Sequence, residues 1–224
     1  MKKFASFFAV FLFITLFAVA SEAGDRNIPV EVAQLTDSLK KQFAPDRRVA
    51  LLDVDYSFSD KNVMLRGVTT SAEAKNALLK ELARKGYTVM DCLELLPDVK
   101  GLEGKTCGII NVSVANMRVA PDFSSEMMTQ SLMGMPVRVL QRDGWVRIQT
   151  PDNYIAWVHR VGVHPVTEEE MAAWNKAEKI VVTAHYGFVY SEPNQTSQTV
   201  SDVVAGNRLK WEGSKGAFYK VTYP

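Results

Sequence analysis

At 224 residues the chain is long enough for one to three small domains, and its 47% hydrophobic and 23% charged residues indicate a folded globular protein rather than a disordered one. The formal net charge of +1 provides no excess of Lys and Arg. This balance excludes nucleic acid as the expected partner, because binding to it depends on positive charge that neutralises phosphates.

The N-terminus has the composition of a secretory signal peptide. A short positive segment precedes an almost wholly apolar run from Phe4 to Ala20, and small residues at 18–20 or 21–23 provide the spacing that signal peptidase cleaves. An uncleaved anchor is the alternative, but a span needs roughly 20 apolar residues and this run is shorter. We therefore expect residues 1–23 to be removed, the mature protein to be periplasmic or secreted, and no membrane span to remain.

Cys92 and Cys107 are the only two cysteines in the chain. In an oxidising compartment they could pair, but the sequence does not fix their geometry, so a disulfide and two free thiols both stay open. No Cys-x-x-Cys occurs, and His159, His164 and His185 do not form a metal-ligand cluster. We expect no metal and no cofactor.

The first folded segment, residues 28–98, alternates helical and strand patterns. Apolar spacing, turn residues and helix-ending residues predict the order helix, strand, strand, helix, strand. These elements lie at about 30–43, 49–58, 63–68, 71–85 and 87–95. The order predicts a small α+β domain with both helices on one face of the sheet.

This segment resembles the BON-type domain, in which a strand, a turn, a strand ending in Leu-x-Gly, a helix and a strand recur. The stretch that carries the resemblance is SDKNVMLRGVTTSAEAKNALLKELARKGYTV, at 59–89. The resemblance implies a domain without chemistry of its own that attaches the protein to a membrane or to a partner. A purely structural spacer is the alternative.

From Cys107 onward the chain consists of short predicted strands that contain an internal repeat. Residues 116–140 align with 188–212 without a gap. The matched positions include Pro121 with Pro193, Gly134 with Gly206, and, after one inserted residue, 145–148 with 218–221. Matched Pro and Gly mark the same turns, so the repeat predicts two copies of one small β-barrel.

Each copy resembles the bacterial SH3 domain, the second copy more distantly. The family pattern is present in the first copy as Asn116, Arg118, Pro121, Gly134, Val137, Val139, Leu140, Gly144, Trp145, Ala156, Trp157 and Val158. The resemblance implies one SH3-like barrel at 108–165 and another at 179–224. A linker helix over 166–178, which Thr167 can cap, would join them. The whole chain is then a BON-like α-β-β-α-β domain followed by two small barrels.

The two copies end differently. In the first, Pro151 is followed by DNYIAWVHRVGV, the predicted closing strand, whereas the sequence stops at the matching Pro224 in the second. A barrel without this strand keeps an open sheet edge. We therefore expect the second barrel to be truncated. We also expect the given sequence to be incomplete at its C-terminus. A natural end with an irregular last module is the alternative.

The sequence predicts no catalytic residues. Asp91-Cys92 matches the start of the Asp-Cys-Ser-Gly motif of cell-wall cysteine peptidases, but Leu93-Glu94 follows. Cys92 lies in a predicted strand, and all three histidines belong to other modules, so we expect a core cysteine rather than a nucleophile.

The whole arrangement resembles the N-terminal half of NlpC-type cell-wall cysteine endopeptidases of Bacteroidetes. These enzymes cleave peptidoglycan stem peptides between D-glutamate and a diamino acid, and their peptidase domain follows the second SH3 module. The resemblance implies a substrate-binding or targeting region without its catalytic domain. A stand-alone cell-wall binding protein and a metabolic enzyme with an unrecognised site are the alternatives.

In that family, an acidic residue and a tyrosine of the first SH3 module bind the free amino end of the substrate's L-alanine. The matching residues here are Glu126 and Tyr154, although Asn153 and Ala156 replace glycines of the family pattern. The second copy has Gln198 in place of Glu126, so the fold does not demand the acid. Glu126 as a solvated loop carboxylate and Tyr154 as a packing residue remain the alternatives.

Overall fold

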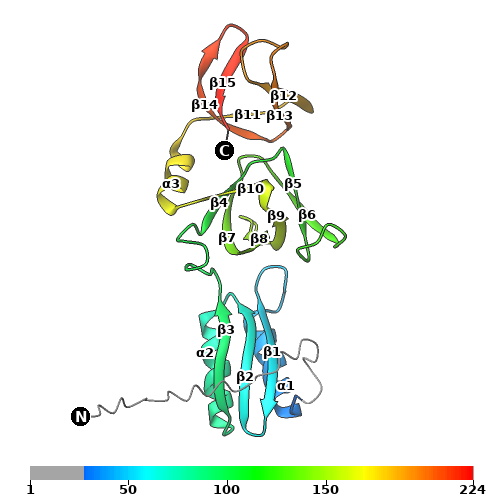
Figure 1. The fold of residues 1–224 in the computed structure, drawn as a ribbon, viewed down its shortest axis with the longest axis vertical. Coiled ribbons are helices and arrows are strands. Elements are labelled where there is room, and N and C mark those ends of the chain that lie inside the picture. The colour runs from blue at the N-terminus through cyan, green and yellow to red at the C-terminus, as the bar shows by residue number, and fades with distance from the viewer. Residues whose placement is uncertain (1–27, 224) are drawn as a thin grey trace, which may run out of the picture.

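The computed structural model describes residues 28–223, which form three units in a row, mostly of β-structure with three α-helices (Figure 1). The predicted signal peptide, residues 1–23, lies outside the described residues. No helix within 28–223 is long and apolar enough to cross a membrane.

The N-terminal domain has the element order that the sequence predicts. Its elements are α1 (Val30–Phe43), β1 (Leu52–Ser59), β2 (Asn62–Thr69), α2 (Ala72–Arg84) and β3 (Thr88–Leu95). The sheet order is β1-β2-β3, with β1 antiparallel and β3 parallel to β2. The connection between the parallel strands is α2, which begins where the Ser71 hydroxyl accepts the Ala74 N–H at 3.0 Å.

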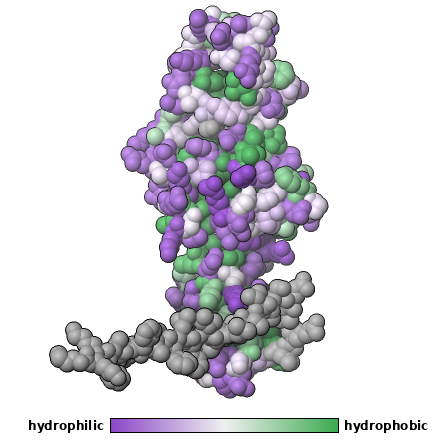
Figure 2. All heavy atoms as spheres, viewed as in Figure 1, coloured by the Kyte–Doolittle hydropathy of each residue, from purple (hydrophilic) through white to green (hydrophobic). Residues whose placement is uncertain are grey.

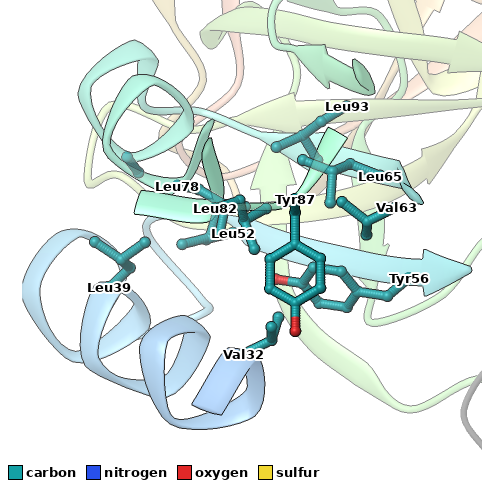
Figure 3. Packing of buried hydrophobic residues seen from close by; sticks show 11 residues of the cluster. Val32, Leu39, Leu52, Tyr56, Val63, Leu65, Leu78, Leu82, Tyr87 and Leu93 are labelled. Carbon is teal, nitrogen blue, oxygen red and sulfur yellow. The ribbon is translucent and has the colours of Figure 1, made fainter. Parts of the chain in front are cut away.

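Both helices pack on one face of this sheet, as the amphipathic patterns predict. Leu39 of α1 and Leu78 of α2 point toward Leu52 and Tyr56 of β1 (Figure 3). Inside this core the Tyr56 hydroxyl and the Thr36 hydroxyl are hydrogen-bonded at 2.5 Å, which satisfies two buried polar groups.

The other face of the sheet is open, and this corrects one expectation. Leu93 of β3 is buried against the helices, whereas its neighbour Cys92 is exposed. Successive side chains of a strand point to opposite faces, so burial of Leu93 places Cys92 on the uncovered face. The prediction of a core cysteine is therefore wrong.

The first barrel follows as one continuous sheet of seven strands. They are β4 (Cys107–Ile110), β5 (Val114–Arg118), β6 (Met127–Leu132), β7 (Pro136–Asp143), β8 (Trp145–Gln149), β9 (Ile155–His159) and β10 (Val163–Val166). Their order is β10-β4-β7-β8-β9-β5-β6, so β9 lies between β8 and β5. The barrel core includes Ile110, Met117, Val139 and Ile148, all fully buried.

A linker helix, α3 (Glu168–Lys176), leads from this barrel to the second module. Its start is a capping box: the Thr167 hydroxyl accepts the Glu170 N–H, and the Glu170 carboxylate accepts the Thr167 N–H. On its buried face, the Trp174 indole N–H donates to the Gly134 carbonyl at 3.3 Å.

The second module repeats the first five strands of the first barrel, and its described residues contain no counterpart of β9 and β10. Its strands are β11 (Lys179–Val181), β12 (Tyr186–Tyr190), β13 (Thr199–Val204), β14 (Arg208–Lys215) and β15 (Phe218–Thr222). Strand β12 begins 72 residues after β5 begins, and it ends 72 residues after β5 ends. The matching turns are also alike: Asp122 Oδ1 accepts the Ser124 N–H, and Asn194 Oδ1 accepts the Thr196 N–H, both at 2.7 Å. The strands of the second module therefore follow the spacing of the repeat in the sequence, and a second SH3 barrel stays a prediction.

The two modules differ in how their strands are joined. Within the described residues, β12 and β13 form a hairpin that is separate from the sheet β11-β14-β15. A groove of about 530 Å³ opens between the two sheets, and Phe188, Tyr190, Phe218 and Val221 lie along it. Apolar residues also reach the surface of this module (upper part of Figure 2).

The N-terminal domain is docked on the first barrel. Leu51 and Leu96 of the domain form a buried cluster with Leu140 and Ile155 of the barrel. Backbone hydrogen bonds run across the same contact: the Ile155 N–H donates to the Arg48 carbonyl at 2.6 Å, and the Asp98 N–H donates to the Leu140 carbonyl at 2.9 Å. Apolar burial and directional hydrogen bonds together fix the orientation of the two units.

Candidate functional site

A small cleft lies where the N-terminal domain meets the first barrel. It is lined by Arg47, Leu51 and Asp53 of the domain and by Val119, Met128, Arg147, Ile155, Ala156 and Trp157 of the barrel. Its enclosed volume is about 20 Å³, enough for one group of the size of a water molecule. Neither unit forms this cleft alone.

The pairing of β8 with β9 sets the main polar feature of the cleft. Arg147 and Trp157 are directly opposite each other in the register of these strands. The guanidinium carbon of Arg147 lies 5.1 Å from the centre of the Trp157 ring. The ring therefore supports the planar cation from one side, in a cation–π contact.

Arg147 is a partly buried cation with little compensation. Its side chain is 15% exposed, and its nearest carboxylate is Asp53, with Nη2 and Oδ2 separated by 3.9 Å. Burial lowers the pKa of Arg147, Asp53 opposes this effect, and the positive charge of Arg47 adds to it. Within the described residues the structure shows no hydrogen bond from the Arg147 guanidinium. The N–H donors of this cation are thus available to another group.

Tyr154 lies at the edge of the cleft, immediately before β9, and its side chain is half-buried. The guanidinium carbon of Arg48 lies 5.9 Å from the centre of its ring. Arg48 is held in turn by Asp46, with Nη2 and Oδ2 at 2.7 Å, and hydrogen bonds from Arg48 lower the pKa of Asp46 to about 2. The loop beside Tyr154 is therefore ordered by its own ion pair.

Glu126 lies on the barrel side of the cleft, immediately before β6, and is exposed. Its carbonyl accepts the N–H of Val119, a cleft residue, at 3.0 Å. In the described part of the chain its carboxylate makes no hydrogen bond or ion pair. Glu126 and Tyr154 are thus each next to a cleft residue, but the structure records no hydrogen bond between them. That they face one another stays a prediction.

Cys92 and Cys107 are both free thiols in the structure. They lie in different sheets, Cys92 in β3 of the N-terminal domain and Cys107 in β4 of the first barrel, and the pairing that the sequence left open is not formed. Burial raises the pKa of the Cys107 thiol, which disfavours the thiolate. Among residues 28–223, no three or more His, Cys, Asp and Glu side chains gather as a metal would require.

The structure also contains an aromatic cluster that sequence reasoning missed. Phe123, which is exposed, lies against Trp145 and His159, with ring centres 4.8 and 5.1 Å away. Trp145 and His159 are cross-strand partners in β8 and β9, which a barrel pattern could have indicated. Phe123 comes from the turn before β6, and no pattern in the sequence indicates that it folds onto them.

One part of the chain matches a known protein family. Residues 117–161 match the family model of the bacterial dipeptidyl-peptidase Sh3 domain. The first barrel is therefore a bacterial SH3 domain, and it carries Glu126, Arg147, Tyr154 and Trp157. A search of curated proteins finds no match.

Solved structures that resemble the chain include two NlpC/P60 proteins and an NlpC protein. An NlpC/P60 family protein from Bacillus cereus ATCC 10987 is 20% identical, with 53% of this chain and 51% of that chain covered at a TM-score of 0.44. An NlpC/P60 endopeptidase from Photobacterium damselae subsp. piscicida is 13% identical, with coverages of 57% and 33% and a TM-score of 0.42. NlpC2 from Trichomonas vaginalis is 14% identical, with 53% and 42% covered at 0.24. The chain spans about half or less of the length of these structures.

Proposed function

We propose that this chain is an exported cell-envelope protein whose first SH3 domain binds peptidoglycan stem peptides through their free N-terminal L-alanine. The observation that carries the proposal is the match of 117–161 to the Sh3 domain of bacterial dipeptidyl-peptidases. The cleft beside Glu126 and Tyr154 supports it, because it gives that domain a concave surface next to both residues.

Glu126 and Tyr154 have distinct roles in this proposal. The Glu126 carboxylate, which is exposed and without a partner among the described residues, accepts hydrogen bonds from the α-ammonium of L-alanine. The Tyr154 ring covers the alanine methyl group. The guanidinium carbon of Arg48 lies 5.9 Å from the centre of this ring and supports the ring from one side.

Peptide cleavage belongs, in this proposal, to an NlpC-type cysteine peptidase domain with which the SH3 domain works. In this proposal the described residues bind the peptide. They contain no hydrogen-bonded Cys–His pair, because neither Cys92 nor Cys107 hydrogen-bonds a histidine among them. The N-terminal sequence, with its signal-peptide composition, supports action in the periplasm or outside the cell, where peptidoglycan is found.

The test is the affinity of the purified protein for L-Ala-γ-D-Glu-meso-diaminopimelate, measured by calorimetry. Glu126→Gln should weaken binding roughly ten- to a hundred-fold, because a hydrogen bond to a charged group contributes about 1.5–3 kcal/mol. N-acetylation of the peptide should weaken binding to the wild type by a similar factor, since it removes the ammonium.

Glu192→Gln is the matched control, because Glu192 is also exposed and lies in the corresponding turn of the second module. This variant should bind as the wild type does. Equal affinity of wild type and Glu126→Gln for the free-amine peptide would show that Glu126 is a solvated loop residue.

A further inference from the structure

We propose that the cleft between the N-terminal domain and the first SH3 domain is a carboxylate-binding subsite, in which Arg147 binds a carboxylate of an acidic peptide. This inference rests on the proposed function, since the peptide is taken to be the one whose amino end Glu126 holds. Arg147 would make a second charged contact with the peptide, opposite in sign to that of Glu126. The residues around this contact come from two domains.

The first argument is the state of Arg147. A guanidinium carries five N–H donors, and the partial burial of Arg147 weakens their hydration without removing its nitrogen atoms from water. Here the side chain is 15% exposed and stacked on Trp157, and Asp53 at 3.9 Å is beyond hydrogen-bonding distance. An entering carboxylate would supply the acceptors that the described residues do not.

The second argument is orientation. The cation–π contact with Trp157 limits the movement of the Arg147 guanidinium, and the cross-strand pairing of the two residues fixes where it lies. A planar, restrained guanidinium is suited to a carboxylate, because the two groups can form two parallel hydrogen bonds. Little side-chain entropy remains to be lost when a ligand binds.

The third argument is the charge around the cleft. Arg47 lines it together with Arg147, and Asp53 is the only carboxylate among the lining residues. The Asp53 side chain is 58% exposed, so water screens its effect on Arg147. The lining of the cleft therefore carries a net positive charge, which complements an anion.

A purely structural role for Arg147 fits these observations less well. Arg147 and Asp53 form an ion pair across the two domains, but at 3.9 Å it includes no hydrogen bond and leaves the guanidinium donors available to a ligand. The SH3 fold does not require a buried arginine either, because Lys220 occupies the matching position of β15 and is exposed. The second module has no described counterpart of β9, the strand that carries Trp157, so the burial of Arg147 depends on β9 as well as on the docked domain.

The size of the cleft limits what it can hold. Its volume of about 20 Å³ admits one carboxylate oxygen, and the remainder of the carboxylate and of the ligand lies over the surface. A stem peptide carries a free ammonium at one end and carboxylates along its length. It can thus present opposite charges to Glu126 and to Arg147 at the same time.

The experiment measures how affinity depends on ligand carboxylates. The probes are L-Ala-γ-D-Glu-meso-diaminopimelate, the same peptide with every carboxylate converted to carboxamide, and acetyl-Glu-Glu-amide, which has carboxylates but no amine. We expect the wild type to bind the acidic tripeptide at least tenfold more tightly than its carboxamide. Arg147→Met should abolish this preference, and Arg147→Lys should retain part of it, because it keeps the charge but loses the planar fork.

Arg142→Met is the matched control, because Arg142 is exposed on β7 and loses the same charge outside the cleft. It should keep the full preference. Arg147→Lys, together with thermal unfolding of each variant, separates loss of the subsite from loss of the fold. A carboxylate preference that survives in folded Arg147→Met overturns the inference.

Three outcomes distinguish this inference from the proposed function. Binding of the tripeptide with a preference that Arg147→Met does not change overturns the subsite and leaves the proposed function standing. Binding of acetyl-Glu-Glu-amide alone, lost in Arg147→Met, supports the subsite and contradicts the proposed function. Failure of the wild type to bind any probe overturns both.

Discussion

At Gly134, between β6 and β7, the backbone of the first SH3 domain meets that of the second module. Its φ of 80° lies in the left-handed region, and a Cβ at this position would be 2.1 Å from the Arg208 carbonyl oxygen. The adjacent Met133 is fully buried with Val203 and Leu209 of the second module, and its carbonyl accepts the Arg208 N–H at 2.9 Å. The absence of a side chain at Gly134 thus permits the contact between the two modules.

Gly134→Ala should separate the second module from the first. Positive φ alone costs an alanine about 1–2 kcal/mol, and the clash with the Arg208 carbonyl adds to it. Gly144→Ala is the matched control: its φ is 67°, and a Cβ there meets nothing within 4 Å. The free energies of unfolding, measured in denaturant, should fall more for Gly134→Ala than for Gly144→Ala. Equal losses would mean that the junction tolerates the extra atom.

The residues of the candidate site could be predicted only in part. Glu126 and Tyr154 could be named as candidates because they occupy positions of a short pattern within one domain, and their role in binding stays a prediction. Arg147 and Asp53 belong to different domains and come together only when these dock. No local pattern encodes that contact, so the cation of the cleft could not be predicted from the sequence.

At the scale of elements, the repeat allowed the strands of the second half to be predicted. Two copies of one pattern constrain each other, and their matching turns use the same hydrogen bond through Asp122 and Asn194. The exposure of β3 could not be predicted in this way. Alternation of side chains shows that Cys92 and Leu93 lie on opposite faces of the sheet. It does not show which of the two faces another element covers.

Hydrogen exchange should differ between matching strands of the two modules. β8 is paired on both sides, with β7 and β9, whereas β15 is paired only with β14. Amides at an unpaired edge exchange more quickly, because no strand protects them. Mass spectrometry of the deuterated protein should therefore show lower protection in Phe218–Thr222 than in Trp145–Gln149. Equal protection of the two strands would show that the edge of β15 is covered in solution.

At the scale of the whole molecule, docking of the N-terminal domain turns one face of an SH3 domain into a cleft. The apolar part of this contact is made by Leu51, Leu96, Leu140 and Ile155. The polar part of the cleft, Arg147 beside Asp53, lies across the same contact. Ligand binding and domain docking should therefore depend on each other, because a ligand that contacts both units favours the docked state.

Leu140→Ala provides the test of this dependence. Leu140 is fully buried within the interdomain cluster, so its truncation should cost about 2–5 kcal/mol and weaken docking. Leu78→Ala is the control, because Leu78 is equally buried but lies in the core of the N-terminal domain. Calorimetry should resolve separate unfolding transitions for the N-terminal domain and the SH3 domain in Leu140→Ala. At 25 °C this variant should also bind the acidic tripeptide more weakly, whereas Leu78→Ala should bind it as the wild type does. If both variants lose the same affinity, the effect arises from general destabilisation, and the cleft does not depend on the interdomain contact.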